Sequence, residues 1–198
     1  QGPARVRASA RVALRAALLW VIGILVVATG VPVYVILPAY AVLFLLSLPF
    51  LGSRAPVLFA VAGVLALVMP WVQPFLDAAP VWSGLGGAEA EALVGWAYPF
   101  PVWIAFLLAG MGLGRCDLRR VRVQVAATVV GSALTVLGYG VARATEDVRY
   151  GNLYLTEVWT AAAHTSGLWE VIGSGGFALA VIGACLLLCR TPLRWVVV

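Results

Sequence analysis

The chain has 198 residues and a net charge of +5, and it is 63% hydrophobic but only 11% charged. A soluble domain of this length could not bury so much apolar surface, so the composition excludes a soluble globular protein and predicts a membrane protein. The basic residues lie in short stretches beside apolar runs, and no basic stripe is interleaved with aromatic residues. We therefore expect contact with a lipid bilayer and no nucleic-acid partner.

Six apolar runs approach the roughly 20 residues that a helix needs to cross a bilayer. In chain order they cover residues 10–29, 33–51, 56–76, 98–114, 122–142 and 168–189. The expected fold is an all-α, polytopic transmembrane bundle of about six spanning helices, forming a single transmembrane domain over residues 1–198.

The charges alternate between successive connections. All 13 basic residues are arginines. The ends of the chain and the even-to-odd connections hold Arg5, Arg7, Arg11, Arg15, Arg54, Arg115, Arg119, Arg120, Arg122, Arg190 and Arg194. The opposite connections hold Asp77, Glu89, Glu91, Glu146, Asp147, Glu157 and Glu170. Since basic residues in short loops mark the cytoplasmic side, we predict a multi-pass protein of the plasma membrane with both termini cytoplasmic.

The second and fourth runs carry local signals. Pro38 and Pro49 lie in the second run and predict a kinked helix, and Tyr40 on this run is a candidate residue of a substrate path. In the fourth run, Gly110 and Gly114 form a G-x-x-x-G motif that predicts a helix contact face.

Four arginines, Arg115, Arg119, Arg120 and Arg122, lie within eight residues before the fifth run. They are typical of a positive-inside anchor. They could instead bind the phosphates of a cytosolic donor such as coenzyme A, because guanidinium groups bind phosphates in a forked geometry.

The fifth run has polar residues at helical spacing. They are Gln124, Thr128, Ser132, Thr135 and Tyr139, which fall within an arc of roughly 80° on a helix. Gly131 and Gly138 border this arc. The row is either a face on which a neighbouring helix packs or one polar wall of a substrate path.

The sixth run follows the only histidine, His164. Thr165 or Ser166 could cap the helix, and Glu170 in its first turn would complement the positive end. His164 is either a surface residue or an outward-facing proton acceptor with Glu170, Glu157 or Asp147 as its partner. The catalytic residues cannot be assigned; His164, Ser166 and Glu170 are weak candidates, since no Gly-x-Ser-x-Gly elbow presents a serine.

Three cysteines, Cys116, Cys185 and Cys189, complete the set of potential ligands. Two thiols one turn apart with no nearby histidine make a poor zinc site, so no metal is expected.

Three stretches resemble a known family. They are VILPAYAVLFLL at 35–46, YPFPVWIAFLLAG at 98–110 running into Gly114 and Arg115, and HTSG at 164–167 followed by VIGSGGFALAVIG at 171–183. In these the chain resembles bacterial, actinobacterial-type membrane acyltransferases similar to heparan-α-glucosaminide N-acetyltransferase.

The resemblance implies a protein of about ten spans that transfers an acyl group, usually acetyl, from cytosolic acetyl-CoA or another acyl-CoA. The acceptor would be a glycan or lipid of the cell envelope on the outer side. Family members also have initial spans with an acid and a histidine, and two terminal spans. We therefore expect this chain to be the middle part of such a protein, completed by further spans or a partner chain. A transporter or flippase-like bundle and a non-catalytic membrane subunit are the alternatives.

Overall fold

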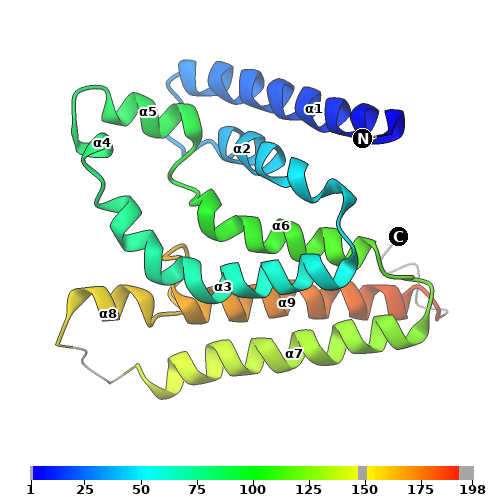
Figure 1. Cartoon of the computed structure of the whole chain (residues 1–198). Coiled ribbons are helices and arrows are strands. Elements are labelled where there is room, and N and C mark those ends of the chain that lie inside the picture. Colours follow the sequence, from blue (N-terminus) through cyan, green and yellow to red (C-terminus); the bar gives the residue numbers. More distant parts are fainter. Residues whose placement is uncertain (1, 147–150, 192–198) are drawn as a thin grey trace.

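The computed structural model of the chain describes residues 2–146 and 151–191, and within these residues every regular element is a helix (Figure 1). The elements are α1 (Pro3–Ala28), α2 (Leu37–Ser47), the 3₁₀ helix η1 (Leu48–Gly52), α3 (Ala55–Asp77), α4 (Pro80–Ser83), α5 (Gly87–Val94), α6 (Phe100–Gly114), α7 (Val121–Ala144), α8 (Leu153–Val158) and α9 (Leu168–Leu188). The predicted all-α fold is confirmed.

Four segments are long and apolar enough to cross a membrane: Arg5–Ala28, Ala55–Ser83, Val121–Ala144 and Leu168–Leu188. The protein is therefore a multi-pass membrane protein. The two remaining predicted spans are apolar helices of less than spanning length, Leu37–Gly52 and Phe100–Gly114. Six apolar helices thus form where six runs were predicted, but only four of them have the expected length.

Proline accounts for the shortened second helix. Pro38 lies in the first turn of α2, where a missing N–H costs no helical hydrogen bond, and residues 31–36 before the helix are not helical. Pro49 lies in the first turn of η1, where the α-helix has already changed to a 3₁₀ helix. Pro38 therefore begins the helix and does not kink it, whereas at Pro49 the helix changes to 3₁₀ geometry inside the segment Leu37–Gly52. Pro70 and Pro74 do lie inside a helix, near the end of α3.

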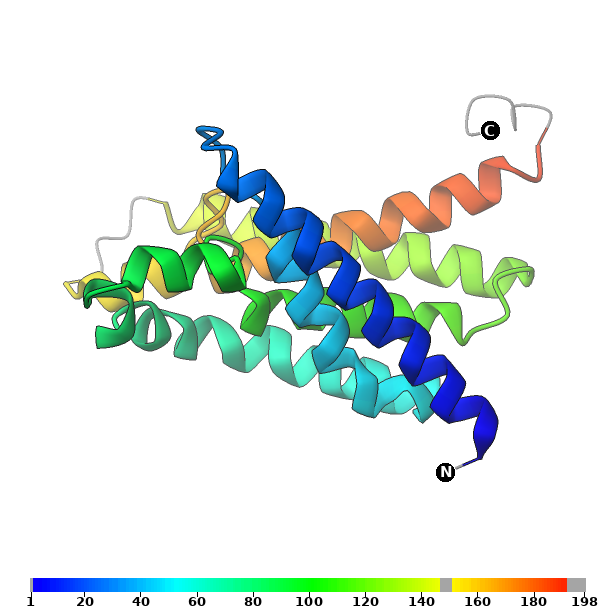
Figure 2. The ribbon, with the colours of Figure 1, turned by 90° about the horizontal axis from the view of Figure 1, so that it is seen from above.

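The helices form two groups that meet along α3. α7 and α9 run antiparallel and side by side in both views (Figures 1 and 2). α3 and α2 both pack on α6. Leu43 of α2, Leu58 and Ala62 of α3, and Ile104 and Leu108 of α6 form one buried cluster. This cluster is the core of the first group.

α1 lies across the surface of α2 (Figure 2). Much of its side-chain surface is uncovered; Leu14 is 61% exposed and Leu25 is 63% exposed. In water this would be an unusual surface, but in a bilayer the lipid chains solvate it.

The arginine-bearing connections meet at one end of the bundle, which we call the arginine-rich end. There the Arg5 guanidinium donates to the Pro49 carbonyl at 3.5 Å, and the Arg115 guanidinium donates to the Leu51 carbonyl at 2.5 Å. The start of α1 and the C-terminal end of α9 both lie at this end (Figures 1 and 2). The sequence therefore sorted the connections correctly, and the side of the membrane that this end faces stays a prediction.

Candidate functional site

The row of polar residues on α7 lies largely against α9. A Cβ atom placed on Gly131 would lie 2.6 Å from the carbonyl oxygen of Gly176, and one placed on Gly138 would lie 2.5 Å from the backbone nitrogen of Gly173. On α9, a Cβ atom placed on Gly183 would lie 2.5 Å from Thr128 Oγ1. Backbone therefore touches backbone along this face, and no larger residue fits at these positions.

The hydroxyl groups of the threonines in the row donate hydrogen bonds to backbone carbonyls of α7 itself. Thr128 Oγ1 donates to the Gln124 carbonyl at 2.9 Å, and Thr135 Oγ1 donates to the Gly131 carbonyl at 2.8 Å. Ser132 and Tyr139, by contrast, are exposed. The face is a helix-packing face in this structure, and its part in a substrate path stays a prediction.

Tyr40 is not part of that row in space. It lies on α2, which packs against α1 and α6, and its side chain is exposed. The structure therefore does not bring it together with the α7 residues.

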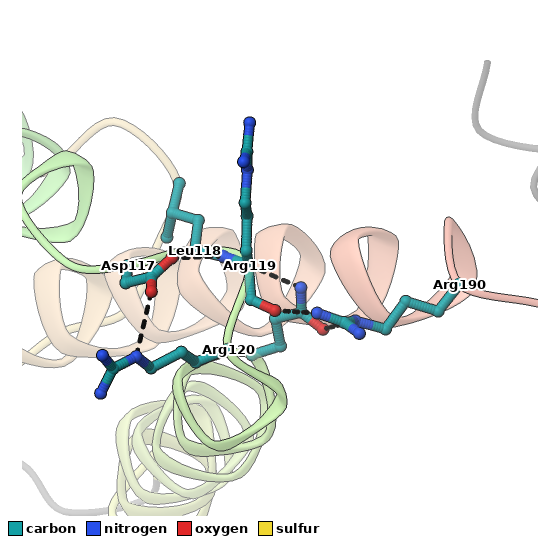
Figure 3. A network of polar contacts seen from close by, with 6 residues as sticks. Asp117, Leu118, Arg119, Arg120 and Arg190 are labelled. Carbon is teal, nitrogen blue, oxygen red and sulfur yellow. Dashed lines mark hydrogen bonds and ion pairs between the residues drawn. The ribbon is translucent and has the colours of Figure 1, made fainter.

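The polar row ends in a hydrogen-bonded node at the arginine-rich end, in which Gln124 is buried and Arg190 is exposed (Figure 3). Gln124 is only 3% exposed; its Nε2 donates to the Leu118 carbonyl at 2.7 Å, and its Oε1 accepts from Arg190 Nε at 2.7 Å. Arg190 also donates to the Arg119 carbonyl. The node ties the basic loop, residues 115–120, to the end of α9. The sequence analysis used Arg190 only to predict the orientation of the chain in the membrane. It missed this contact, which joins residues 66 positions apart.

The arginines of the basic loop do not form one cluster. Arg120 Nε pairs with Asp117 Oδ2 at 3.0 Å, and the Arg119 backbone N–H donates to Asp117 Oδ1 at 3.2 Å. These two hydrogen bonds, the one from Arg120 first, lower the pKa of Asp117 below its usual value of 3.8. The side chains of Arg119 and Arg120 point in different directions (Figure 3), while Arg115 turns toward η1. Arg122 is exposed in the first turn of α7.

A groove of about 310 Å³ opens beside Arg115. It lies between α1, the α2–η1 segment and α6, and we call it the α1/α2/α6 groove. Its lining residues are Val12, Phe44, Ser47, Leu51, Leu107, Met111, Gly114 and Arg115. Ser47 donates its hydroxyl to the Phe44 carbonyl at 2.7 Å, so the wall of the groove is apolar apart from Arg115.

The same region corrects one sequence prediction. A Cβ atom on Gly110 or Gly114 would meet nothing within 4 Å, so the G-x-x-x-G motif faces open space among the described residues. The glycine that α6 uses for packing is Gly112, where a Cβ would lie 3.1 Å from the Phe59 ring. The prediction of a contact face at Gly110 and Gly114 within this chain was wrong.

At the opposite end, Glu170 organises the loop that leads into α9. Its carboxylate accepts the backbone N–H of His164 at 2.5 Å and that of Ser166 at 2.7 Å. Both donors have left-handed backbone, with φ values of 64° and 58°. Holding two non-glycine residues in this region costs free energy that the paired hydrogen bonds offset.

This arrangement changes the expected roles of the residues. The N-cap of α9 is Gly167, without a side-chain cap, so the prediction that Thr165 or Ser166 caps the helix was wrong. Glu170 instead reaches back from the first turn, as the acid of a capping box does. It contacts the backbone of His164, and among the described residues no hydrogen bond to the imidazole ring is found. Ser166 is buried; Asp147 lies outside the described residues.

Aromatic side chains gather at this second end, which we call the aromatic end. Trp159 packs edge-on against both Trp71 and Trp169, with ring centroids 6.3 and 5.0 Å apart. Near them is a pocket of about 380 Å³. Its lining includes Tyr139, Arg143, Glu146, Thr156, Trp159 and Thr160. Arg143 and Glu146 form an exposed ion pair at its edge.

A further polar contact at the aromatic end was missed by sequence reasoning. Asp77 Oδ1 accepts from Gln73 Nε2 at 2.8 Å and from Trp96 Nε1 at 2.9 Å. The spacing of Gln73 and Asp77, four residues apart on one helix, was the signal that could have revealed half of it. The hydrogen bond from Trp96 to Asp77 joins the end of α3 to the segment that precedes α6.

Within the described part of the chain, no group of three His, Cys, Asp or Glu side chains is placed to hold a metal ion. Comparison with protein-family models, with curated proteins and with solved structures finds no match to this chain.

Proposed function

We propose that the chain is part of an integral-membrane acyltransferase. It would take an acyl group, acetyl in the first instance, from cytosolic acyl-CoA and pass it to a glycan or glycolipid of the cell envelope. In this proposal the arginine-rich end faces the cytoplasm, as its excess of arginine favours. The resemblance of three sequence stretches to such enzymes motivates the proposal.

The observation that carries the proposal is the basic loop. Gln124 donates to the Leu118 carbonyl and Arg190 donates to the Arg119 carbonyl, and these hydrogen bonds fix the backbone of the loop. The side chains of Arg119, Arg120 and Arg122 are exposed at the surface of the arginine-rich end. A loop with a fixed backbone and exposed guanidinium groups suits the phosphates of coenzyme A, because less side-chain and loop ordering is needed on binding.

The acceptor would bind at the aromatic end. The pocket beside Trp159 offers an aromatic wall together with hydroxyl groups of Tyr139, Thr156 and Thr160. Such a mixture of apolar surface and a few polar groups is typical of small-molecule sites. The catalytic residues stay unassigned. Since Glu170 is engaged by backbone N–H groups, it is a positioning residue of the His164 loop.

The test is acyl-CoA binding to the purified chain in detergent, measured by calorimetry. The variant is Arg119→Ala/Arg120→Ala, and the matched control is Arg7→Ala/Arg11→Ala, which removes two exposed arginines of α1 at the same end. We expect the loop variant to weaken binding by at least about tenfold, as the loss of charged hydrogen bonds predicts. The control should change affinity by less than about threefold.

Two outcomes would contradict the proposal. Absence of binding in a folded sample would remove the donor site and favour a transporter or a non-catalytic subunit. Equal weakening in both double variants would show that acyl-CoA responds only to the total positive charge of this end.

A further inference from the structure

The α1/α2/α6 groove has the chemistry of a lipid site. Its walls are apolar side chains from three helices, among them Val12, Phe44, Leu107 and Met111. The hydroxyl of Ser47 is used within its own helix, so the wall presents no free donor or acceptor apart from Arg115 at one end. A nucleotide or a sugar would leave its polar groups unpaired in such a groove, whereas a hydrocarbon chain would not.

Positive charge surrounds the end of the groove at which Arg115 lies. Arg115 and Arg5 each donate to a carbonyl of η1, at Leu51 and Pro49 respectively. These acceptors are neutral, so neither guanidinium charge is compensated. Among the described residues at this end, the only ion pair joins Arg120 to Asp117. An anionic group at the mouth of the groove would therefore meet uncompensated positive charge.

The surroundings supply one ligand that matches both features. The helices that form the groove belong to a multi-pass membrane protein, so lipid chains lie against their outer surfaces. Gly114 leaves open space where a larger side chain would close the groove. We infer that an anionic phospholipid binds in the α1/α2/α6 groove, with one acyl chain along Phe44, Leu107 and Met111 and its phosphate at Arg115. Arg5, which donates to the Pro49 carbonyl of η1, adds further attraction.

The site can be tested by photo-crosslinking. The chain is reconstituted in nanodiscs with trace phosphatidylglycerol that carries a photoactivatable acyl chain, and the labelled peptides are identified by mass spectrometry. The same experiment with a matched phosphatidylcholine probe reports the contribution of the headgroup charge. We expect phosphatidylglycerol to label residues 107–115 at least about fivefold more than phosphatidylcholine does, which one arginine near a membrane surface would produce.

Two pairs of variants separate the groove from the general surface. Gly114→Leu fills the groove, and Gly110→Leu adds the same side chain one turn away, where it also meets open space. Arg115→Gln removes the charge at the mouth, and Arg122→Gln removes an exposed charge elsewhere at the same end. We expect Gly114→Leu and Arg115→Gln to lower phosphatidylglycerol labelling by about fivefold, and the two controls to leave it within twofold.

Three results would overturn the inference. Equal labelling by both probes would show an ordinary lipid-facing surface without a site. Equal losses in Gly110→Leu and Gly114→Leu, with unfolding excluded by an unchanged circular dichroism spectrum, would place the lipid elsewhere. Displacement of the label by acetyl-CoA at micromolar concentration would assign the groove to the proposed donor and not to a phospholipid.

Discussion

α7 and α9 bring their backbones together along nearly their whole lengths, whereas α1 packs on α2 and leaves many of its large side chains exposed. In the first pair, glycines bring the two backbones into direct contact. They are Gly131, Gly138, Gly173, Gly176 and Gly183. In the second case, Gly23 lies against side-chain atoms of Pro38 and Leu37 on α2. Arg5 contacts η1, and Trp20 Nε1 donates to the Leu93 carbonyl of α5 at 2.8 Å. Both regions are apolar, so hydrophobicity does not explain the difference.

The comparison shows what holds helices together in a bilayer. Lipid chains are as apolar as leucine, so helix association depends on close packing and on hydrogen bonds rather than on removal of apolar surface from water. Each atomic contact contributes only about 0.1–0.2 kcal/mol, and many contacts are needed. α7 and α9 achieve them with glycines, while α1 keeps most of its large side chains toward lipid.

The largest effect should come from placing a side chain in the α7/α9 interface. In Gly138→Leu the new Cβ would lie 2.5 Å from the Gly173 nitrogen and 2.8 Å from the Trp169 carbonyl oxygen, and neither backbone atom can move aside. We expect a loss of about 3 kcal/mol or more in the free energy of unfolding, measured by denaturant titration in mixed micelles. Gly140→Leu on the same helix meets nothing within 4 Å and serves as the control. Since leucine is a better helix former than glycine, helix propensity predicts no loss in either variant. Equal losses would mean that close packing at Gly138 does not set the stability of the pair.

A smaller, local effect is expected on α1. In Gly23→Leu the new Cβ would lie 2.7 Å from Pro38 Cδ, a ring atom bonded to the backbone nitrogen, so α2 would have to move away. We expect about 1–3 kcal/mol of destabilisation and separation of α1 from α2, while α7 and α9 stay paired. Spin-label distances within each pair would measure this, with Gly63→Leu as the control at an open position. Loss of both pairs together would show that the two regions fold as one unit.

The node of Gln124 and Arg190 at the arginine-rich end should contribute less to stability than the glycine interface. Arg190→Gln removes the donor to the Gln124 side chain and to the Arg119 carbonyl. The expected loss is about 1.5–3 kcal/mol, the range for hydrogen bonds to charged groups. Arg122→Gln, an exposed position, should stay within about 0.5 kcal/mol. A negligible change in Arg190→Gln would show that water replaces the arginine at this node.

The smallest effect concerns pH. The pKa of Asp117 is lowered by the hydrogen bonds from Arg120 and from the Arg119 backbone. A lowered pKa contributes stability above the unfolded value, and this contribution is lost as the pH falls through the folded value. The pairing should therefore persist at pH 4 and disappear only in more acidic solution. A carboxyl NMR titration that places the pKa of Asp117 at or above 3.8 would contradict this, and Arg120→Gln should raise it.

The sequence predicted the helices better than their ends or their partners. The length of the apolar runs located all six apolar helices, because a helix that faces lipid or a protein core carries apolar side chains over many residues. The start of α2 was misplaced because Pro38 was interpreted as a kink and not as a first-turn residue. α5 was missed, although Gly86 and Gly95, both with positive φ, bound a stretch of good helix formers.

The candidate site was predictable only where its residues are neighbours in sequence. The α7 row and its glycines follow from helical spacing. α9 packs against the glycines and against Thr128 and Thr135, while Ser132 and Tyr139 are exposed. Nothing local distinguishes Gly112, which packs on Phe59, from Gly110 and Gly114, which do not pack within the described chain. The contact between Gln124 and Arg190 depends on the register of two helices, which a single sequence does not specify.

The close approach of α7 and α9 has a consequence for membranes of different thickness. α7 has 24 residues, or about 36 Å at 1.5 Å per residue. Because backbone meets backbone, the pair cannot adapt by changing side-chain rotamers, and its two helices must tilt together. α1 meets α2 at Gly23 through side-chain atoms of Pro38 and Leu37, so its tilt is less tightly fixed. A thinner or thicker bilayer should therefore be accommodated by α1 and by the lipids beside it, while the distance from the basic loop to the Glu170 carboxylate stays constant.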